Sequence, residues 1–329
     1  MKRQKFARIV VIAAVLLGAC APQPAKPEPA TISVRLKWLH QVQFAGIYVA
    51  QQEGYYAEEG LTVKLDQVDF NQQVSYEKLL SGENDIAIGA PEELILARSA
   101  GKPVRAVAVI FRLNPVVFIA PAEAGISRPS DFLGKTIALS PGQTIILYEA
   151  MMSRLGLDRS KITEIDAPSY DFHECWQAAA ACPDYATNGF ARARVEGLDF
   201  TAVWPSEYGV PFYGDVIVTT DEFLQKHPDV VERFVRATLK GWQKAAENPD
   251  LGTSATLVFD PQLDKSVQLA ALKASLPLID TGEDEIGWMR PEIWQQMHDI
   301  LLEQGLLDAP FDVTAVYDNQ YVEKAYANR

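Results

Sequence analysis

The chain has 329 residues, a formal net charge of −13, 48% hydrophobic residues and 22% charged residues. These values are those of a globular protein with enough chain for two domains. A surface this acidic excludes nucleic acid as an expected partner, because the phosphate backbone attracts basic proteins.

The N-terminal segment has the pattern of a secretion signal followed by a tether. Four basic residues precede the apolar run 9–17, which is too short to span a bilayer. The run leads into Leu-Gly-Ala-Cys at 17–20, which resembles the bacterial lipobox, where the signal is cut before the cysteine and the thiol takes a diacylglycerol. We therefore predict a signal peptide at 1–19 and a proline-rich tether at 20–30.

Cys20 is accordingly expected to be the lipidated N-terminus of the mature protein, with a fatty acid such as palmitate attached. The protein would then lie on the extracytoplasmic face of the cell membrane, held there through the lipid anchor only. An ordinary signal peptide with an incidental cysteine is the alternative.

From residue 31 onward, strand and helix patterns alternate along the chain. The first unit comprises strands at 31–38, 61–67, 85–89 and 104–111, with helices at 44–57, 75–81 and 91–100. The second comprises strands at 116–121, 136–139, 162–166 and 201–204, helices at 142–155 and 172–181, and a segment 185–195 that begins as a strand. A return strand at 213–219 precedes helices at 222–226, 230–246, 263–276 and 291–304. This alternation implies an α/β protein with parallel or mixed sheets, and two such units predict two lobes and a cleft.

Two cysteines remain beyond the signal. In an oxidising compartment, Cys175 and Cys182 predict a disulfide that fixes a local loop, with two free buried thiols as the alternative. No metal site is expected, because only His173 lies nearby and no second Cys/His pair completes a ligand set.

Short motifs that keep their order along the chain resemble a known family. They are Leu36 to Trp38, Gln43 to Gln51, Leu80 to Glu83, Asp131 to Ile137, Tyr185 to Asn188, Tyr208 to Asp215, Phe234 to Trp242 and Ile286 to Met289. Together they span nearly the whole mature chain and are similar to the periplasmic substrate-binding proteins of ABC importers, in the sulfonate-binding and thiamine-pyrimidine-synthase-like group.

The resemblance implies a fold, a division into lobes and a set of partners. The fold would be the two-lobed α/β periplasmic-binding-protein fold of type II, with the ligand closed in a cleft between the lobes. Lobe one would comprise 31–114 and 213–329, and lobe two 115–212. The expected partners are a small molecule and the permease and ATPase subunits of an importer, with no cofactor.

Several residues are candidates for ligand contact in such a cleft. Trp38 ends the first predicted strand, and ligand pockets lie beyond the carboxyl ends of sheet strands. Phe44 and Tyr48 are four residues apart, so they share one helix face and could stack on a flat ring, although Tyr48 fits a core position equally well. Glu92 opens a predicted helix after a strand and could accept from a ligand N–H or hydroxyl group.

Other candidates come from the expected lobe crossings and from the family motifs. Asn114 lies at the first crossing and can both donate and accept. Gln143 and Thr144 resemble the family loop where a helix N-terminus faces the ligand. Asn188 falls on the family's Thr-Asn-Glu motif, in which Gly189 here replaces the usual glutamate. Trp204 and Tyr208 bracket the second crossing.

The resemblance leaves three classes of function to compare. A eukaryotic relative of the same fold is an enzyme that builds the thiamine pyrimidine with a histidine in the first helix segment and a cysteine-rich iron motif. Here Phe44 takes the histidine's place and residues 209–213 contain no cysteine, so a non-catalytic receptor without a metal is expected. A ligand sensor that signals to a kinase is the third possibility.

The candidate cleft residues are aromatic groups and amides, with no arginine among them. A sulfonate ligand needs strong donors, so we expect a neutral planar heteroaromatic vitamin instead, riboflavin first. Formylaminopyrimidine, a thiamine precursor, is the alternative ligand, although Gly189 lacks the carboxylate that some relatives direct at a ligand amine.

Overall fold

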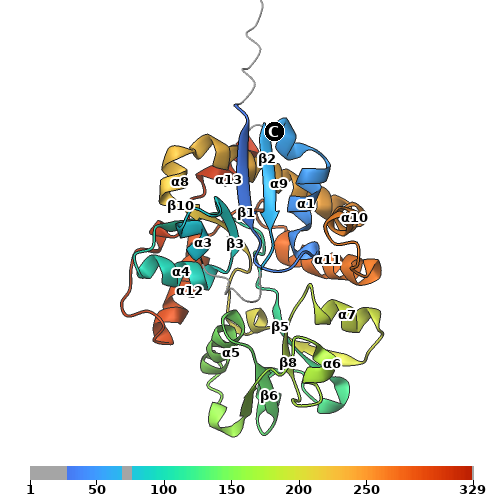
Figure 1. Ribbon diagram of the computed structural model, residues 1–329. Helices are drawn as coiled ribbons and strands as arrows, with labels where there is room; N and C mark the ends of the chain where they lie inside the picture. The colour runs from blue at the N-terminus through green and yellow to red at the C-terminus, as the bar shows by residue number, and fades with distance from the viewer. Residues whose placement is uncertain (1–27, 69–75, 328–329) are drawn as a thin grey trace, which may run out of the picture.

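The computed structural model describes residues 28–68 and 76–327, and they form two lobes (Figure 1). The predicted signal peptide, Cys20 and most of the tether lie outside the described residues. None of the helices that the structure describes has the length and apolar character needed to cross a membrane.

The upper lobe in Figure 1 is built on a mixed five-stranded sheet in the order β2-β1-β3-β10-β4. The strands are β1 (Ala30–Arg35), β2 (Leu61–Asp66), β3 (Ile86–Gly89), β4 (Val104–Val109) and β10 (Val216–Thr220). β1 runs parallel to β2 and β3, whereas β10 runs antiparallel to β3 and β4. β10 enters this sheet after the chain has passed through the other lobe, which is why it lies between strands much earlier in the sequence.

The lower lobe contains two small sheets. β5 (Val116–Pro121) pairs antiparallel with β8 (Cys182–Tyr185) on one side and β9 (Phe200–Val203) on the other. β6 (Thr136–Leu139) and β7 (Thr163–Asp166) form a parallel pair. Two connections, 110–115 and 204–215, join this lobe to the five-stranded sheet.

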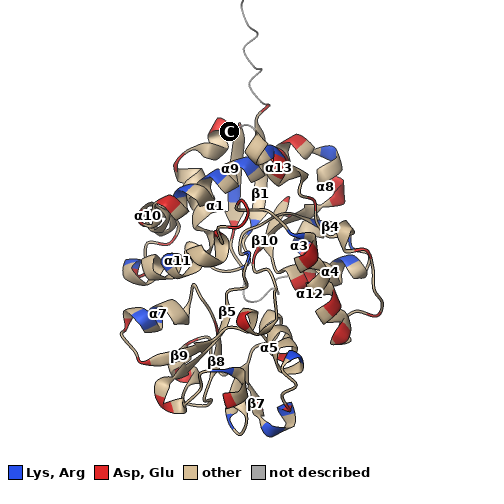
Figure 2. Cartoon of the chain, turned by 180° about the vertical axis from the view of Figure 1, so that it is seen from behind, with Lys and Arg blue, Asp and Glu red and all other residues tan. Residues whose placement is uncertain are grey.

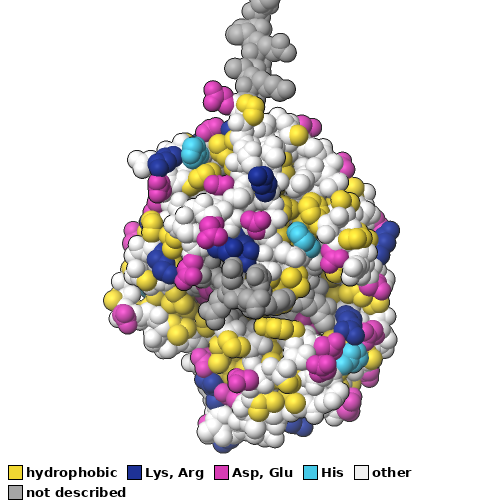
Figure 3. Space-filling view, in the orientation of Figure 1, with side chains coloured by type: hydrophobic (Ala, Val, Ile, Leu, Met, Phe, Trp, Pro, Cys, Tyr) yellow, Lys and Arg dark blue, Asp and Glu magenta, His cyan; other side chains and the backbone are white. Residues whose placement is uncertain are grey.

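Helices cover the sheets of both lobes (Figure 1). The α-helices are α1 (Ala45–Gln52), α2 (Tyr55–Glu58), α3 (Glu77–Leu80), α4 (Pro91–Ser99), α5 (Gln143–Arg154), α6 (Phe172–Cys175), α7 (Gly189–Val195), α8 (Asp221–Lys226), α9 (Pro228–Glu247), α10 (Pro249–Phe259), α11 (Lys265–Ile279), α12 (Pro291–Glu303) and α13 (Gln320–Ala327). Figure 2 shows acidic and basic residues interspersed along these outer helices, and Figure 3 shows the same mixture on the face of Figure 1.

Most expected elements are present, with three differences. The expected helix 172–181 is only the four-residue α6, because the chain turns after it and Ala181 bridges to Ile137 in the lower lobe. The strand expected at the start of 185–195 instead ends at Tyr185, and α7 follows. The sequence patterns did not predict α10 or α13.

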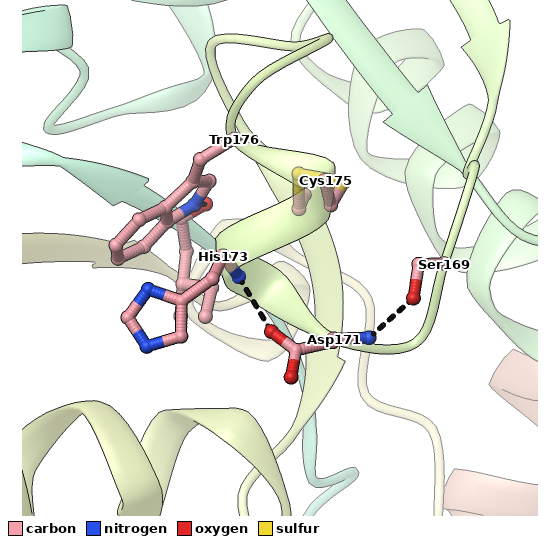
Figure 4. The surroundings of a disulfide bond; sticks show 7 residues. Ser169, Asp171, His173, Cys175 and Trp176 are labelled. Atoms are coloured by element: carbon pink, nitrogen blue, oxygen red, sulfur yellow. Dashed lines mark hydrogen bonds between the residues drawn. A yellow bond between two sulfur atoms is a disulfide. The ribbon is translucent and has the colours of Figure 1, made fainter.

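Cys175 of α6 and Cys182 of β8 form a disulfide, as the cysteine count predicted (Figure 4). The turn before α6 is fixed independently, since the Asp171 carboxylate accepts from the His173 backbone N–H at 2.9 Å. The disulfide therefore joins α6 to the first residue of the strand that ends in Tyr185 at the cleft.

The lobes also touch beside the connections. In Figures 1 and 2, α7 of the lower lobe lies next to α11 of the upper lobe, and Ala191 of α7 is buried in the same core cluster as Leu272 of α11. On the opposite side, the Gln304 side-chain amide donates to the Ile146 carbonyl oxygen of α5 at 2.8 Å. The cleft between the lobes is therefore bounded by contacts on both flanks.

A close approach of α1 and α9 sets the position of the loop that precedes α1. Two glycines permit it: a Cβ on Gly241 would lie 2.0 Å from the Gly46 carbonyl oxygen, and a Cβ on Gly46 would lie 2.2 Å from the Trp242 ring. Since neither space can hold a methyl group, the sequence requires glycine at both positions.

Gly241→Ala should therefore lower the free energy of unfolding by about 2 kcal/mol, because the added methyl group forces the two helices apart. The measurement is urea unfolding followed by circular dichroism. The neighbouring surface variant Lys240→Ala loses only the exposed ion pair with Glu58 and should change stability by less than about 1 kcal/mol. Equal effects of the two variants would contradict this account of the helix contact.

Candidate functional site

A cleft of about 570 Å³ lies between the lobes. Its upper wall comes from the residues that follow β1 and β3, and its lower wall from the start of α5 and from β8 with the turn after it. Because β1 and β3 are parallel, their carboxyl ends open at the same edge of the sheet, which is where ligands bind in α/β proteins.

An ion pair between a partly buried lysine and a buried carboxylate forms the floor of the cleft. Lys37 Nζ, just after β1, lies 3.1 Å from Asp215 Oδ1, just before β10. The Gln43 amide donates to Asp215 Oδ2 at 2.7 Å, and the Tyr185 hydroxyl of the lower lobe donates to Asp215 Oδ1 at 2.9 Å. The floor thus joins both lobes through one carboxylate that is 1% exposed.

Lys37 keeps its charge in this environment. Burial alone would lower the pKa of the ammonium group, but the carboxylates of Asp215, Glu92 and Glu93 outweigh it and raise the pKa above its ordinary value. The group also lies 3.4 Å from Gln143 Oε1. A lysine with a raised pKa is cationic at neutral pH, so it can donate to ligand oxygen atoms.

Glu92 faces the same space from the N-terminus of α4. Pro91 opens that helix, where a missing N–H costs nothing, and the Glu92 side chain is fully buried. Its Oε2 accepts from the Gln143 amide of the lower lobe at 2.8 Å. Its Oε1 has no hydrogen-bond partner in the part of the chain that the structure describes. Burial raises the pKa of Glu92, against the opposing effect of Lys37.

Two aromatic side chains from opposite lobes meet at the cleft. The rings of Trp38 and Tyr170 lie edge to face with centroids 5.4 Å apart. Tyr170 is 75% exposed, so it presents an apolar ring to solvent at the side of the cleft. An aromatic pair of this kind offers ring faces and edges to a flat ligand.

The structure brings five of the predicted site residues to the cleft walls: Trp38, Glu92, Gln143, Thr144 and Asn188. They come from the loop after β1 and from the N-terminal ends of α4, α5 and α7. Their contact with a ligand stays a prediction.

Phe44 and Tyr48 do not line the cleft, which corrects their expected role. They share a helix face as predicted, but that face is turned into the upper-lobe core, where they are 1% and 0% exposed. Tyr48 stacks on Phe259 of α10 at 4.4 Å, and its hydroxyl lies 2.8 Å from His40 Nδ1. Helical spacing predicts that the two rings share one helix face, but it does not predict whether that face lies toward the cleft or toward the core.

Asn114, Trp204 and Tyr208 lie in the connections between the lobes, as expected, but they are not among the residues that line the cleft. Asn114 ties the two connections together, because its amide donates to the Tyr213 carbonyl oxygen at 2.6 Å and its Oδ1 accepts from the Val116 N–H at 3.0 Å. Trp204 packs edge to face on Phe190 at 5.1 Å, and Tyr208 packs against the core on the lower-lobe side. These three side chains hold the lobes and connections instead of facing the cleft.

Tyr170, Glu93 and Asp184 of the cleft lining were not predicted as site residues. Nor were the four residues that form the floor: Lys37, Gln43, Tyr185 and Asp215. All four stand inside motifs that carried the family resemblance, yet no single pattern shows that they meet. A polar residue directly after a buried strand was the usable signal for Lys37, and one directly before a buried strand for Asp215.

The glycine at position 189 is explained by its neighbour Asp184. Asp184 Oδ1 accepts from the backbone N–H groups of Tyr185 at 2.6 Å and Gly189 at 3.0 Å. A Cβ at residue 189 would lie 2.1 Å from Asp184 Oδ2, so only glycine leaves room for this carboxyl group.

Within the residues described, no group of three or more His, Cys, Asp or Glu side chains is arranged to hold a metal ion.

Comparison with known proteins adds sequence and structural relatives. Residues 41–251 match the model of the family described as NMT1/THI5 like. The chain is 27% identical to the riboflavin-binding protein RibY of Chloroflexus aurantiacus, over 92% of this chain and 89% of RibY. It is 28% identical to the formylaminopyrimidine-binding protein of Halalkalibacterium halodurans, over 92% and 94% of the two chains.

The solved structure of the periplasmic aliphatic sulphonate binding protein SsuA from Escherichia coli superimposes with a TM-score of 0.70. The match covers 89% of this chain and 94% of that structure at 13% identity. The two-lobed periplasmic-binding-protein fold expected from the sequence is therefore confirmed.

Breaking the floor ion pair from one side should be costly. Lys37→Met leaves the Asp215 carboxylate buried without its cation, and we expect the free energy of unfolding at neutral pH to fall by about 3 kcal/mol. The double variant with Asp215→Asn should recover a large part of that loss. The measurement is a double-mutant cycle by urea unfolding.

The matched control for this cycle is Lys240→Met, which breaks the exposed Lys240–Glu58 pair and should cost less than about 1 kcal/mol. A Lys37→Met variant as stable as this control would contradict a structural role for the floor pair.

Asp184 predicts a pH dependence of stability. Burial raises its pKa to about 7, against the backbone N–H donors that lower it. A carboxyl group with a raised folded-state pKa stabilises the fold while protonated, and this contribution is lost as the pH rises through about 7. Asp184→Asn keeps the acceptor oxygen but cannot ionise, so its stability relative to the unmutated chain should increase from about pH 5 to about pH 8.

Unfolding midpoints at several pH values measure this effect. Asp171→Asn is the control, because the Arg192 guanidinium outweighs burial and holds the pKa of Asp171 below its usual range. The stability difference between Asp171→Asn and the unmutated chain should not change with pH above about pH 5. If the stability difference between Asp184→Asn and the unmutated chain did not change with pH, Asp184 would be ionised over the whole pH range measured.

Proposed function

The chain belongs to the NMT1/THI5-like family, and we propose that it is the solute receptor of an ABC importer for a planar heteroaromatic vitamin, riboflavin. Its similarity to RibY and to the formylaminopyrimidine-binding protein, each over more than nine tenths of this chain, supports a binding function over catalysis.

The combination of an aromatic pair and a polar floor in one cleft carries the proposal. The rings of Trp38 and Tyr170 offer contact to a flat ligand, and Lys37 and Glu92 offer an ammonium group and a carboxyl group. A cleft of about 570 Å³ falls in the range of pockets that enclose a small organic ligand. The tricyclic ring of riboflavin suits the aromatic part, and its polar ring edge suits the floor.

Charge argues against a sulfonate, despite the shared fold with sulfonate-binding proteins. Glu92, Glu93 and Asp184 line the cleft, whereas Lys37 is the one cation among the described lining residues and already pairs with Asp215. Once these three carboxyl groups are ionised, a ligand with a permanent negative charge would meet more carboxylates than cations there.

Formylaminopyrimidine is the second candidate, and the same carboxyl groups favour it. An exocyclic amine can donate to Glu92 or Glu93, and both carboxyl groups lie at the start of α4 in the upper wall. Among the relatives, the protein named for this ligand is as similar as RibY.

The proposed transport cycle depends on movement of the lobes. With lobe one at 31–114 and 213–329 and lobe two at 115–212, a ligand that contacts both lobes favours their closed arrangement. The connections tied by Asn114 are where such movement would centre. The closed receptor would dock on the permease, and lipid at Cys20 would hold it at the extracytoplasmic face of the membrane.

Riboflavin titration with the purified chain tests the proposal, followed by quenching of flavin fluorescence. We expect one-to-one binding, and Trp38→Ala should weaken it about tenfold, because the ring contact contributes about 1 kcal/mol beyond buried area. Tyr55→Ala, on α2 of the upper lobe outside the cleft lining, is the control and should bind as tightly as the unmutated chain. Binding of formylaminopyrimidine without riboflavin binding would establish the second candidate, and equal losses in both variants would remove Trp38 from the site.

A further inference from the structure

We propose that the cleft floor recognises the imide edge of the ligand ring, with its N–H donated to Glu92 and a neighbouring carbonyl oxygen held by Lys37. The inference rests on the proposed function and deepens it, because it fixes which end of the flavin ring enters first. The benzenoid end would then point toward Trp38 and Tyr170.

The unpartnered oxygen of Glu92 is the first observation. Glu92 lines the cleft, its side chain is fully buried, and its Oε1 has no hydrogen-bond partner among the described residues. A buried acceptor left without a donor costs free energy in a folded protein. A ligand N–H at this position would remove that cost, so the site selects a ligand that carries a donor there.

Lys37 supplies the complementary donor. Its contact with Asp215 is 3.1 Å long, whereas its contacts with Gln143 Oε1 and the Tyr185 hydroxyl are both 3.4 Å. An ammonium group has three protons, and hydrogen bonds of 3.4 Å are longer than the usual range. A ligand carbonyl oxygen can therefore replace the weak contact with Gln143 without disturbing the floor pair.

The contacts of the Gln143 side-chain amide show which pattern of hydrogen-bond donor and acceptor fits between Lys37 and Glu92. Its oxygen faces Lys37 at 3.4 Å and its nitrogen donates to Glu92 Oε2 at 2.8 Å. One amide thus presents an acceptor to the lysine and a donor to the glutamate. The imide edge of the flavin ring offers the same adjacent C=O and N–H groups. We infer that the ligand displaces Gln143 and that its N–H then bonds to the Glu92 carboxyl group, where Oε1 has no partner and Oε2 has lost the Gln143 amide.

This arrangement predicts opposite effects for the two side chains that now bond to each other. Glu92→Met should weaken riboflavin binding at least about tenfold, because the ligand N–H loses its acceptor. Gln143→Ala should strengthen binding about threefold, because the ligand no longer competes with a side chain for the floor. Gln295→Ala on α12, whose amide bonds to Asp299 outside the cleft, is the control and should leave binding unchanged.

The test compares riboflavin with N3-methylriboflavin, which lacks the imide proton, by calorimetric titration of the full chain and these variants. Methylation should weaken binding to the unmutated chain at least about tenfold and make little difference to Glu92→Met, where the acceptor is already absent. Because the ligand comparison needs no variant, it holds even if Glu92→Met fails to fold.

The outcomes separate the two proposals. Tight binding of riboflavin with equal binding of its N3-methyl form would overturn the imide inference and leave the proposed function standing. Weaker binding by Gln143→Ala would also overturn the inference, since Gln143 would then be a ligand contact and not a competitor. No binding of riboflavin by the unmutated chain would overturn both.

Discussion

The ion pair between Lys37 and Asp215 is the interaction on which the cleft depends. It joins Lys37, two residues beyond the end of β1, to Asp215, directly before β10, and Tyr185 of the lower lobe extends it to β8. Two charges removed from water are costly unless they are paired and further hydrogen-bonded. Asp215 meets that condition with three donors, and Lys37 in turn offsets the buried charge of Glu92.

The floor also explains how one fold can serve different ligands. The structure superimposes on a sulphonate-binding protein, yet fold alone does not determine what a cleft binds. In this chain the described lining contains three carboxyl groups and one ammonium group. The Gln143 side-chain amide lies between two of these groups: its oxygen contacts Lys37 and its nitrogen donates to Glu92. The site can therefore accept another group with adjacent C=O and N–H.

Local sequence patterns predicted much of the fold. The strands predicted at 116–121 and 136–139 have the same bounds as β5 and β6. Short apolar runs between turn residues leave little choice of where a strand begins and ends. The disulfide followed from the number of cysteines and the expected compartment. The helix at 172–181 was overestimated, because an alanine-rich stretch favours a helix while the tertiary bridge from Ala181 requires an extended chain.

The site was harder to predict than the fold. Lys37 and Asp215 are 178 positions apart in the sequence, and only the order of the strands brings them together. Phe44 and Tyr48 share a face as their spacing predicts, but packing against α10 decides that this face lies in the core. Glu92 was predicted because it opens a helix after a strand, which is a local signal. Gln143 was predicted only because its turn resembles the family loop at a helix N-terminus.

A crystal structure of the chain with riboflavin tests the central claim most directly. The account predicts the flavin ring between the lobes, with its imide edge against Glu92 and Lys37 and the Gln143 side chain displaced from both. A ring bound outside the cleft, or bound in it with the ribityl chain on the floor and Gln143 unmoved, would contradict the account.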